Sequence, residues 1–169
     1  MPPPTFTITP VSTPADLSAI ATLFNSYATA LQIDLTFQSF ASELANLPGA
    51  YSPPRRGALL LARETGTGAA MGCVALRALG DANCNTAFDC AEMKRLYVAP
   101  AGRGRGVGKA LAEAVVSEAK GLGYEAVRLD TLPNMHAARA VYEGMGFREI
   151  EGYYATPIEG TIFLELKLR

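Results

Sequence analysis

The sequence predicts an α+β domain built on one mixed, mostly antiparallel sheet that is flanked by helices. Apolar residues recur at helical spacing early in the chain and again after residue 106, and short apolar or β-branched runs separate these segments. The order of elements adds a third observation, because a hairpin followed by β-α-β-α and a closing strand brings parallel and antiparallel neighbours into one sheet. No internal repeat or linker interrupts the chain, so we expect one domain over residues 1–169.

The N-terminal part is expected to hold one strand and two helices. Three prolines within residues 1–4 indicate a flexible leader, and the alternation over Thr5–Thr9 indicates a strand. Thr13 before Pro14 is typical of an N-cap followed by proline at the first helical position, and the spacing beyond it predicts a helix of about 18 residues. A second, shorter helix is expected over 38–47, where a Pro-Gly pair ends it.

The remaining elements follow from apolar runs and the glycines and prolines between them. Two runs separated by a turn with two glycines predict a hairpin, and a long central strand follows a polar loop at 81–86. A glycine-rich segment then leads into an apolar stripe at helical spacing. The expected strands are 58–62, 71–76, 88–98, 125–132 and 161–168, and the expected helices run from Val107 to about Gly121 and over 135–145.

Composition excludes several classes of protein. Hydrophobic residues make up 49% and charged residues 18%, which excludes disordered and fibrous chains, and a net charge of −1 without basic blocks disfavours nucleic-acid binding. The three cysteines have no C-x-x-C spacing and His136 is the sole histidine, so we expect no metal. An odd cysteine count without a secretory signal favours free thiols and a cytoplasmic location, and polar residues interrupt the longest uncharged stretch, so no membrane span is expected.

The glycine-rich segment is a candidate phosphate-binding loop. A run of glycines between a strand and a helix exposes backbone N–H groups to an anion. The nucleoside-triphosphate P-loop does not fit, because Arg103 stands at its first glycine and Ala110 at its metal-binding hydroxyl. The dinucleotide fingerprint G-x-G-x-x-G fails from every possible start. What remains is Arg-x-x-Gly-x-Gly over Arg103, Gly106 and Gly108, or a flexible turn without a ligand.

Over residues 92–147 the sequence resembles the GNAT superfamily of N-acetyltransferases. The resemblance rests on the Arg-x-x-Gly-x-Gly loop and on the segment 134–147, which begins with asparagine and contains Ala-x-x-Tyr followed by Gly-Phe. It implies a GNAT-like domain in which backbone amides of the loop hold the pyrophosphate of acetyl-CoA, the cosubstrate. The cofactor-binding residues that it implies are Leu96, Tyr97, Val98, Arg103, Gly104, Arg105, Gly106, Val107, Gly108, Lys109, Asn134, Ala138 and Tyr142.

The resemblance also assigns chemical roles. Tyr142 would protonate the departing thiolate, Asn134 would contact the pantetheine arm or the acceptor side, and the N–H of Val98 would polarise the thioester carbonyl. The alternatives are that Asn134 is only an N-cap and Tyr142 only a half-buried helix residue.

Acetyl transfer also needs a base, because a primary amine with a pKa of about 10 is charged at neutral pH. Glu92 is the first candidate, since some family members carry the catalytic glutamate six residues before the strand end, and apolar neighbours would raise its pKa. The alternative is a strand-face charge paired with Lys94 or Arg95. Asp130, on the adjacent strand, is the second candidate for the base.

Acceptor pockets in this superfamily draw on the first helices and on the loop before the last strand. The candidate residues there are Tyr27, Asp34, Phe37, Tyr153 and Tyr154, together with Asp130. Aromatic residues with few carboxylates favour a small-molecule amine over a histone tail as the substrate. We expect the protein to have no nucleic acid or membrane partner and to be a monomer or a homodimer. The alternative function is a catalytically inactive CoA-binding sensor or scaffold module.

Overall fold

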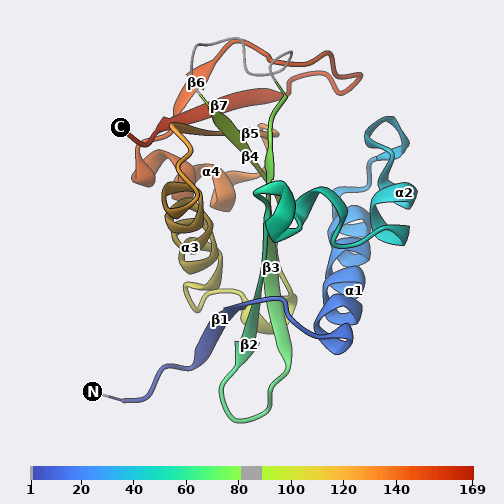
Figure 1. Cartoon of the computed structure of the whole chain (residues 1–169), viewed down its shortest axis with the longest axis vertical. Coiled ribbons are helices and arrows are strands. Elements are labelled where there is room, and N and C mark those ends of the chain that lie inside the picture. The colour runs from blue at the N-terminus through green and yellow to red at the C-terminus, as the bar shows by residue number, and fades with distance from the viewer. Residues whose placement is uncertain (1, 81–88) are drawn as a thin grey trace.

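The computed structural model describes residues 2–80 and 89–169, which form one seven-stranded sheet with helices on both faces (Figure 1). The strand order is β1-β2-β3-β4-β5-β7-β6, and neighbours are antiparallel except for β4 and β5. The strands are β1 (Phe6–Pro10), β2 (Ala58–Glu64), β3 (Ala70–Ala78), β4 (Cys90–Val98), β5 (Ala126–Thr131), β6 (Arg148–Ile150) and β7 (Ile162–Lys167). The α-helices are α1 (Pro14–Leu31), α2 (Phe40–Ala45), α3 (Val107–Gly121) and α4 (His136–Met145). The predicted fold class is confirmed.

Different helices cover the two faces of the sheet. In Figure 1 the sheet is seen nearly edge-on, with α1 and α2 on one side and α3 and α4 on the other. Ile20 and Phe24 of α1 are fully buried against one face, and Leu111 and Val115 of α3 are fully buried against the other. Strands β2 and β3 are thus covered on both faces, which explains why their sequences are continuous apolar runs without alternation.

The start of α1 follows its sequence signal. The Oγ1 atom of Thr13 accepts a hydrogen bond from the Asp16 N–H at 3.1 Å, and Asp16 Oδ2 accepts one from the Thr13 N–H at 3.3 Å. This capping box satisfies N–H groups that have no acceptor inside the helix, and Pro14 has no N–H to satisfy. The helix then runs to Leu31 as predicted.

Two expected elements have other bounds in the structure, and one strand was not expected. The helix expected over 38–47 is shorter, because Ser39 has a left-handed φ of 56° that separates α2 from a 3₁₀ turn at Thr36–Gln38. The strand expected from residue 88 begins at Cys90, and Phe88 and the loop expected at 81–86 lie outside the described residues. The three-residue edge strand β6 was not predicted, because so short a strand shows no alternation.

Strands β4 and β5 separate soon after they meet. Their parallel register covers Cys90↔Ala126, Ala91↔Val127 and Glu92↔Arg128, although β4 continues to Val98 and β5 to Thr131. Strand β4 also bulges against β3, with Arg95 at a φ of 61°. The C-terminal half of β4 therefore has a sheet partner on its β3 edge and a gap on its β5 edge.

The cysteines do not all behave as expected. Cys73 is free and buried, and its thiol donates to the Arg95 carbonyl at 3.4 Å. Cys90 is disulfide-bonded, so the expectation of free thiols is wrong there, and Cys84 lies outside the described residues. Among the helices that the structure describes, none combines the length and the apolar character needed to cross a bilayer.

We expect Gly72→Ala to destabilise the protein, because its Cβ would lie 2.8 Å from the Tyr97 carbonyl oxygen and 3.0 Å from Leu111 Cδ1. Overpacking of this kind lowers the free energy of unfolding by about 1–3 kcal/mol. Gly144→Ala is the matched control, since no atom lies within 4 Å of its new Cβ and alanine favours a helix by about 0.5–1 kcal/mol. Urea unfolding measures both, and equal midpoints would contradict the close approach at Gly72.

Candidate active site

The glycine-rich segment forms a turn that leaves the start of α3 open. Gly104 and Gly106 have φ values of 73° and 79°, a region that suits glycine, and Gly106 is the N-cap. The N-cap has no side chain to accept a hydrogen bond, and the first intrahelical bond is Ala110 N–H to the Gly106 carbonyl at 3.1 Å. The three preceding N–H groups therefore lack helical acceptors and lie where the helix dipole favours an anion.

This helix start borders a cavity of about 740 Å³. It lies between the turn, the end of β4 and the start of α4, and α1 contributes Tyr27 to its wall. Most of the predicted cofactor residues line it, namely Leu96, Tyr97, Val98, Arg103, Gly104, Gly106, Val107, Gly108, Lys109, Asn134 and Ala138. The structure thus brings both predicted segments to one cavity.

Two arginines of the turn point their side chains in different directions. Arg103 lines the cavity, and its Nε donates to the Val98 carbonyl at 3.2 Å. Arg105 is absent from the cavity wall, because its guanidinium pairs with Glu64 at 2.9 Å and donates to the Thr5 carbonyl at 3.3 Å. Only the backbone of Arg105 is left for the role predicted for it.

The end of β4 presents a backbone donor to the gap. The Ala99 N–H donates to the Met71 carbonyl of β3 at 2.8 Å. Successive N–H groups of a strand point to opposite edges, so the Val98 N–H points to the β5 edge, where pairing has ended at Glu92. Because Val98 also lines the large cavity, its N–H is placed for a carbonyl oxygen bound there.

Two further cavities continue from the large one. A small cavity of about 20 Å³ lies in the gap between β4 and β5 and shares Tyr27, Leu96 and Met135 with the large cavity. A third cavity, of about 280 Å³, lies beyond it and shares Gln38 and Lys94 with the small one. The three cavities are therefore neighbours and follow one another from the turn to α2 and the segment before β7.

Tyr142 lies at the small cavity rather than the large one. It is 5% exposed and lines the small cavity with Leu96, Lys94 and Asp130. Its ring contacts Phe147, with 5.6 Å between the ring centroids. Burial raises the pKa of the Tyr142 hydroxyl, which therefore stays protonated at neutral pH.

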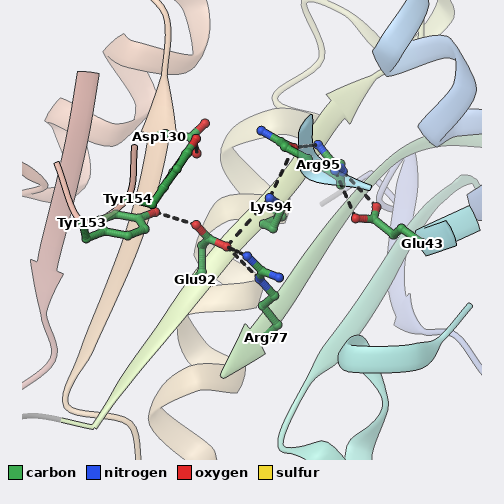
Figure 2. Close-up of polar contacts among 9 residues, drawn as sticks. Glu43, Arg77, Glu92, Lys94, Arg95, Asp130, Tyr153 and Tyr154 are labelled. Carbon is green, nitrogen blue, oxygen red and sulfur yellow. Dashed lines mark hydrogen bonds and ion pairs between the residues drawn. The ribbon is translucent and has the colours of Figure 1, made fainter. Parts of the chain in front are cut away.

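Glu92 is 1% exposed and its carboxylate is fully engaged (Figure 2). Its Oε1 accepts hydrogen bonds from Nε and Nη2 of Arg77, both at 2.8 Å, and its Oε2 accepts one from the Tyr153 hydroxyl at 2.6 Å. The Lys94 ammonium is 3.8 Å from Oε1. Of the three cavities, Glu92 borders only the third. Of the two ion-pair partners predicted for it, Lys94 is at a long distance and Arg95 pairs with Glu43 instead.

Asp130 occupies the opposite side of the gap, on β5. Its Oδ2 accepts a hydrogen bond from the Tyr154 hydroxyl at 2.7 Å, whereas its Oδ1 has no protein partner among the described residues. Asp130 borders the small cavity together with Tyr142 and Lys94. Burial raises the pKa of the Asp130 carboxyl, although the Tyr154 hydrogen bond acts in the opposite direction.

A buried arginine holds the bulge of β4 in place. Arg95 donates to Glu43 of α2 from Nε at 2.9 Å and from Nη2 at 3.0 Å, and its Nη1 donates to Gln38 Oε1 at 2.8 Å. Its guanidinium also lies over the rings of Tyr27 and Phe40, at 5.6 and 5.2 Å from their centroids. These contacts fasten α2 to the strand that borders all three cavities.

The remaining predicted residues divide between the site and the surface. Tyr27 borders the large and the small cavity, and Tyr153 and Tyr154 border the third. Asn134 lines the large cavity and is not the N-cap of α4, a position that Met135 occupies without a side-chain bond. Asp34 is exposed and accepts a hydrogen bond from the Thr36 N–H at 2.9 Å, away from the three cavities. The side chain of Phe37 lies outside what the structure describes.

The sequence analysis did not assign four polar residues to the cavities. They are Gln38, Glu43, Arg77 and Lys94. Arg77 faces Glu92 because the β3–β4 register places them opposite each other, and the pattern of charges on β4 gave no sign of this. The described residues hold no group of three or more side chains suited to a metal ion.

The match to known proteins extends over most of the chain. The family model described as Acetyltransferase (GNAT) family matches residues 19–147. An uncharacterised N-acetyltransferase of Schizosaccharomyces pombe is 37% identical over 168 residues, which cover 99% of this chain and 98% of the relative. These matches agree with the two segments on which the predicted resemblance rests.

Solved structures share the fold. A Klebsiella pneumoniae protein described as an acyl-CoA N-acyltransferase superposes with a TM-score of 0.70 at 27% identity, covering 99% of this chain and 100% of that one. A Salmonella typhimurium protein described as an acetyltransferase, with acetyl-CoA as its cofactor, gives 0.66 at 21% identity and covers 98% and 95%. The prediction of an N-acetyltransferase is confirmed, and the chain belongs to the acetyltransferase (GNAT) family.

Proposed function

We propose that this enzyme transfers the acetyl group of acetyl-CoA to the primary amine of a small molecule. The observation that carries the proposal is the series of neighbouring cavities, in which an uncapped helix start stands at one end and a polar chamber of about 280 Å³ at the other. A chamber of this size suits a small acceptor. Gln38 and Tyr154 belong to its wall and come from segments far apart in the sequence.

The residues at the turn fit the cosubstrate. Unpaired N–H groups of Val107, Gly108 and Lys109 suit a pyrophosphate, and the 740 Å³ cavity, whose wall includes this helix start and Asn134, has room for a pantetheine arm. Acetyl-CoA supplies the acetyl thioester, whose C–S bond is exchanged for the C–N bond of the product. The acetyl-CoA bound by the Salmonella typhimurium neighbour supports this assignment.

For the base, the geometry supports Asp130 over Glu92. Both oxygens of Glu92 already accept short hydrogen bonds, and Glu92 does not border the small cavity. Asp130 does border it, and Oδ1 is available to accept the proton that the amine loses. We therefore propose Asp130 as the direct base, with Glu92, the residue implied by the resemblance, as the alternative that experiment must separate.

Tyr142 is proposed as the acid. It borders the small cavity together with Leu96, and Leu96 also belongs to the wall of the large cavity next to it. A tyrosine whose pKa is raised by burial keeps its proton until a stronger base, such as a departing thiolate, needs it. The Val98 N–H is the proposed donor to the carbonyl oxygen.

The alternative function, a CoA-binding module without catalysis, would need neither Asp130 nor Tyr142 at the same small cavity. A monomer or homodimer in the cytoplasm, with no nucleic acid or membrane partner, stays a prediction. The disulfide at Cys90 removes one of the grounds for the cytoplasmic location.

Acetyl-CoA should raise the thermal unfolding midpoint. A ligand at one hundred times its Kd adds about 2.7 kcal/mol to the stability of the native state, or roughly 5–10 °C for a chain of this length. Thermal-shift titrations with acetyl-CoA, CoA and ATP measure the effect. No shift with the two CoA compounds would overturn the cosubstrate assignment, and a shift with ATP alone would restore the nucleotide alternative.

Gly108→Val should weaken acetyl-CoA binding by at least about tenfold, because a branched side chain at the helix start would occupy the space beside Val98 that an anion needs. Ser117→Val is the matched control, since it adds the same side chain to an exposed position of α3. Calorimetric titration measures both affinities. Equal affinity in the two variants would show that the turn does not bind the cosubstrate.

Asp130→Asn should lower kcat/KM by about 10²–10⁴-fold. The rate of the wild type should rise with pH as the Asp130 carboxyl loses its proton, and the variant should lack this acidic limb. The raised pKa of Asp130, set by burial and opposed by Tyr154 and Lys94, moves the limb above the usual range of a carboxyl group. Tyr142→Phe should keep the limb and lower the plateau.

Glu92→Gln separates the two carboxylates, because it keeps the side-chain shape and the acceptor for Tyr153. We expect it to keep the acidic limb of the pH profile. If Glu92→Gln loses the limb and Asp130→Asn keeps it, the base is Glu92. If Asp130→Asn and Tyr142→Phe are both fully active, neither side chain has its proposed role.

A further inference from the structure

Lys94 is a buried cation without a close acceptor. Its side chain is 10% exposed, and its nearest acceptors among the described residues are Gln38 Oε1 at 3.4 Å and Glu92 Oε1 at 3.8 Å. Hydrogen bonds from ammonium groups to oxygen are usually about 2.7–2.9 Å long. Both oxygens already have closer donors, since Arg95 donates to Gln38 at 2.8 Å and Arg77 donates to Glu92 at 2.8 Å.

Such an ammonium group has only long contacts, whereas burial favours short ones. Desolvation accordingly lowers the pKa of Lys94, in spite of the opposing effect of Glu92. The lysine borders both the small cavity and the 280 Å³ chamber, so a molecule in either one can reach its ammonium group. An anion, such as a carboxylate, is the group that would give this ammonium group a short partner.

A group of opposite sign stands across the small cavity. Asp130 borders the same 20 Å³ space as Lys94, and its Oδ1 has no donor from the described part of the protein. A space of about 20 Å³ holds a single small group, and an ammonium group is the one that suits a carboxylate. One cavity thus presents a cation and an anion to its contents, at the place where the acceptor amine must meet the thioester.

We propose that the acceptor is a free amino acid, whose carboxylate pairs with Lys94 while its α-amino group enters the small cavity beside Asp130. This inference rests on the proposed function. The remaining side chain of the amino acid occupies the 280 Å³ chamber, where Arg77, Tyr153 and Tyr154 line the wall. The two charges of an amino acid are separated by two carbon atoms, so its carboxylate can meet Lys94 from the 280 Å³ chamber, which Lys94 also borders, while only the amino group enters the small cavity.

Other classes of amine fit the charges less well. A polyamine or an aminoglycoside would bring further cations toward Lys94 and Arg77, and like charges in a buried site repel each other strongly. The N-terminus of a peptide has a neutral amide where an amino acid has its carboxylate, so Lys94 would stay unpaired. A free amino acid is the class that completes both charges at once.

The test compares three forms of each acceptor with the wild-type enzyme. The amino acids that occur in proteins, their carboxamides and the amines formed by their decarboxylation are assayed with acetyl-CoA by release of free thiol. A hydrogen bond to a charged group changes affinity by about 10- to 100-fold. We expect at least one amino acid to exceed its carboxamide and its decarboxylated amine in kcat/KM by this factor.

The variant Lys94→Met tests whether Lys94 causes the preference for an amino acid over its decarboxylated amine. It should lower kcat/KM for the preferred amino acid by about 10- to 100-fold more than for the decarboxylated amine, mainly through KM. Both rates are measured at a pH above the acidic limb, because loss of Lys94 also raises the pKa of Asp130 and affects both acceptors alike. Lys120→Met is the matched control, because it removes an exposed lysine of α3 and should change neither rate. Stabilisation of each variant by acetyl-CoA verifies that it is folded.

The outcomes separate this inference from the proposed function. Carboxamides or decarboxylated amines used as well as the amino acids would overturn the inference and leave acetyl transfer intact. An amino-acid preference that Lys94→Met leaves unchanged would overturn the role of Lys94. If no amino acid, amide, amine, polyamine, aminoglycoside or peptide releases thiol while acetyl-CoA still stabilises the fold, the proposed function itself fails.

Discussion

The early end of the β4–β5 pairing determines the rest of the site. After Glu92↔Arg128 the two strands diverge, so the Val98 N–H and the side chain of Asp130 face a gap instead of a neighbouring strand. Backbone groups that lose a sheet partner need another one. A helix start, a tyrosine from α4 and a series of cavities converge on that gap because the sheet does not close it.

Charged side chains lie along β4 at the start of the gap. Glu92 and Arg95 are buried, and Lys94 between them is nearly so, close to the bulge of the strand. The Arg95–Glu43 pair and the Glu92–Arg77–Tyr153 contacts satisfy most of these groups, as Figure 2 shows. Buried pairs of this kind add little net stability but are costly to break, so they specify geometry more than they strengthen the fold.

The sequence was most informative where the physics is local. The capping box of α1 and the glycine turn before α3 depend on neighbours within a few residues, and both could be predicted from spacing. The partners of Glu92 could not. Arg77 contacts Glu92 because of the β3–β4 register, and Tyr153 contacts it from the segment before β7. Both contacts join residues far apart in the sequence, so no short sequence pattern predicts them. The position of Lys94 likewise depends on the bulge at Arg95, which the residue types of β4 do not predict.

Both arginines of the glycine turn contact other parts of the protein, and this lowers the entropy cost of binding the cosubstrate. Arg103 donates a hydrogen bond to the Val98 carbonyl, and Arg105 forms an ion pair with Glu64 at the end of β2. A free loop would lose conformational entropy each time it closed on a ligand. Here the two contacts restrict the turn before a ligand binds, so less of that entropy is left to lose on binding. Its glycines therefore allow close approach of the backbone without making the binding surface a mobile one.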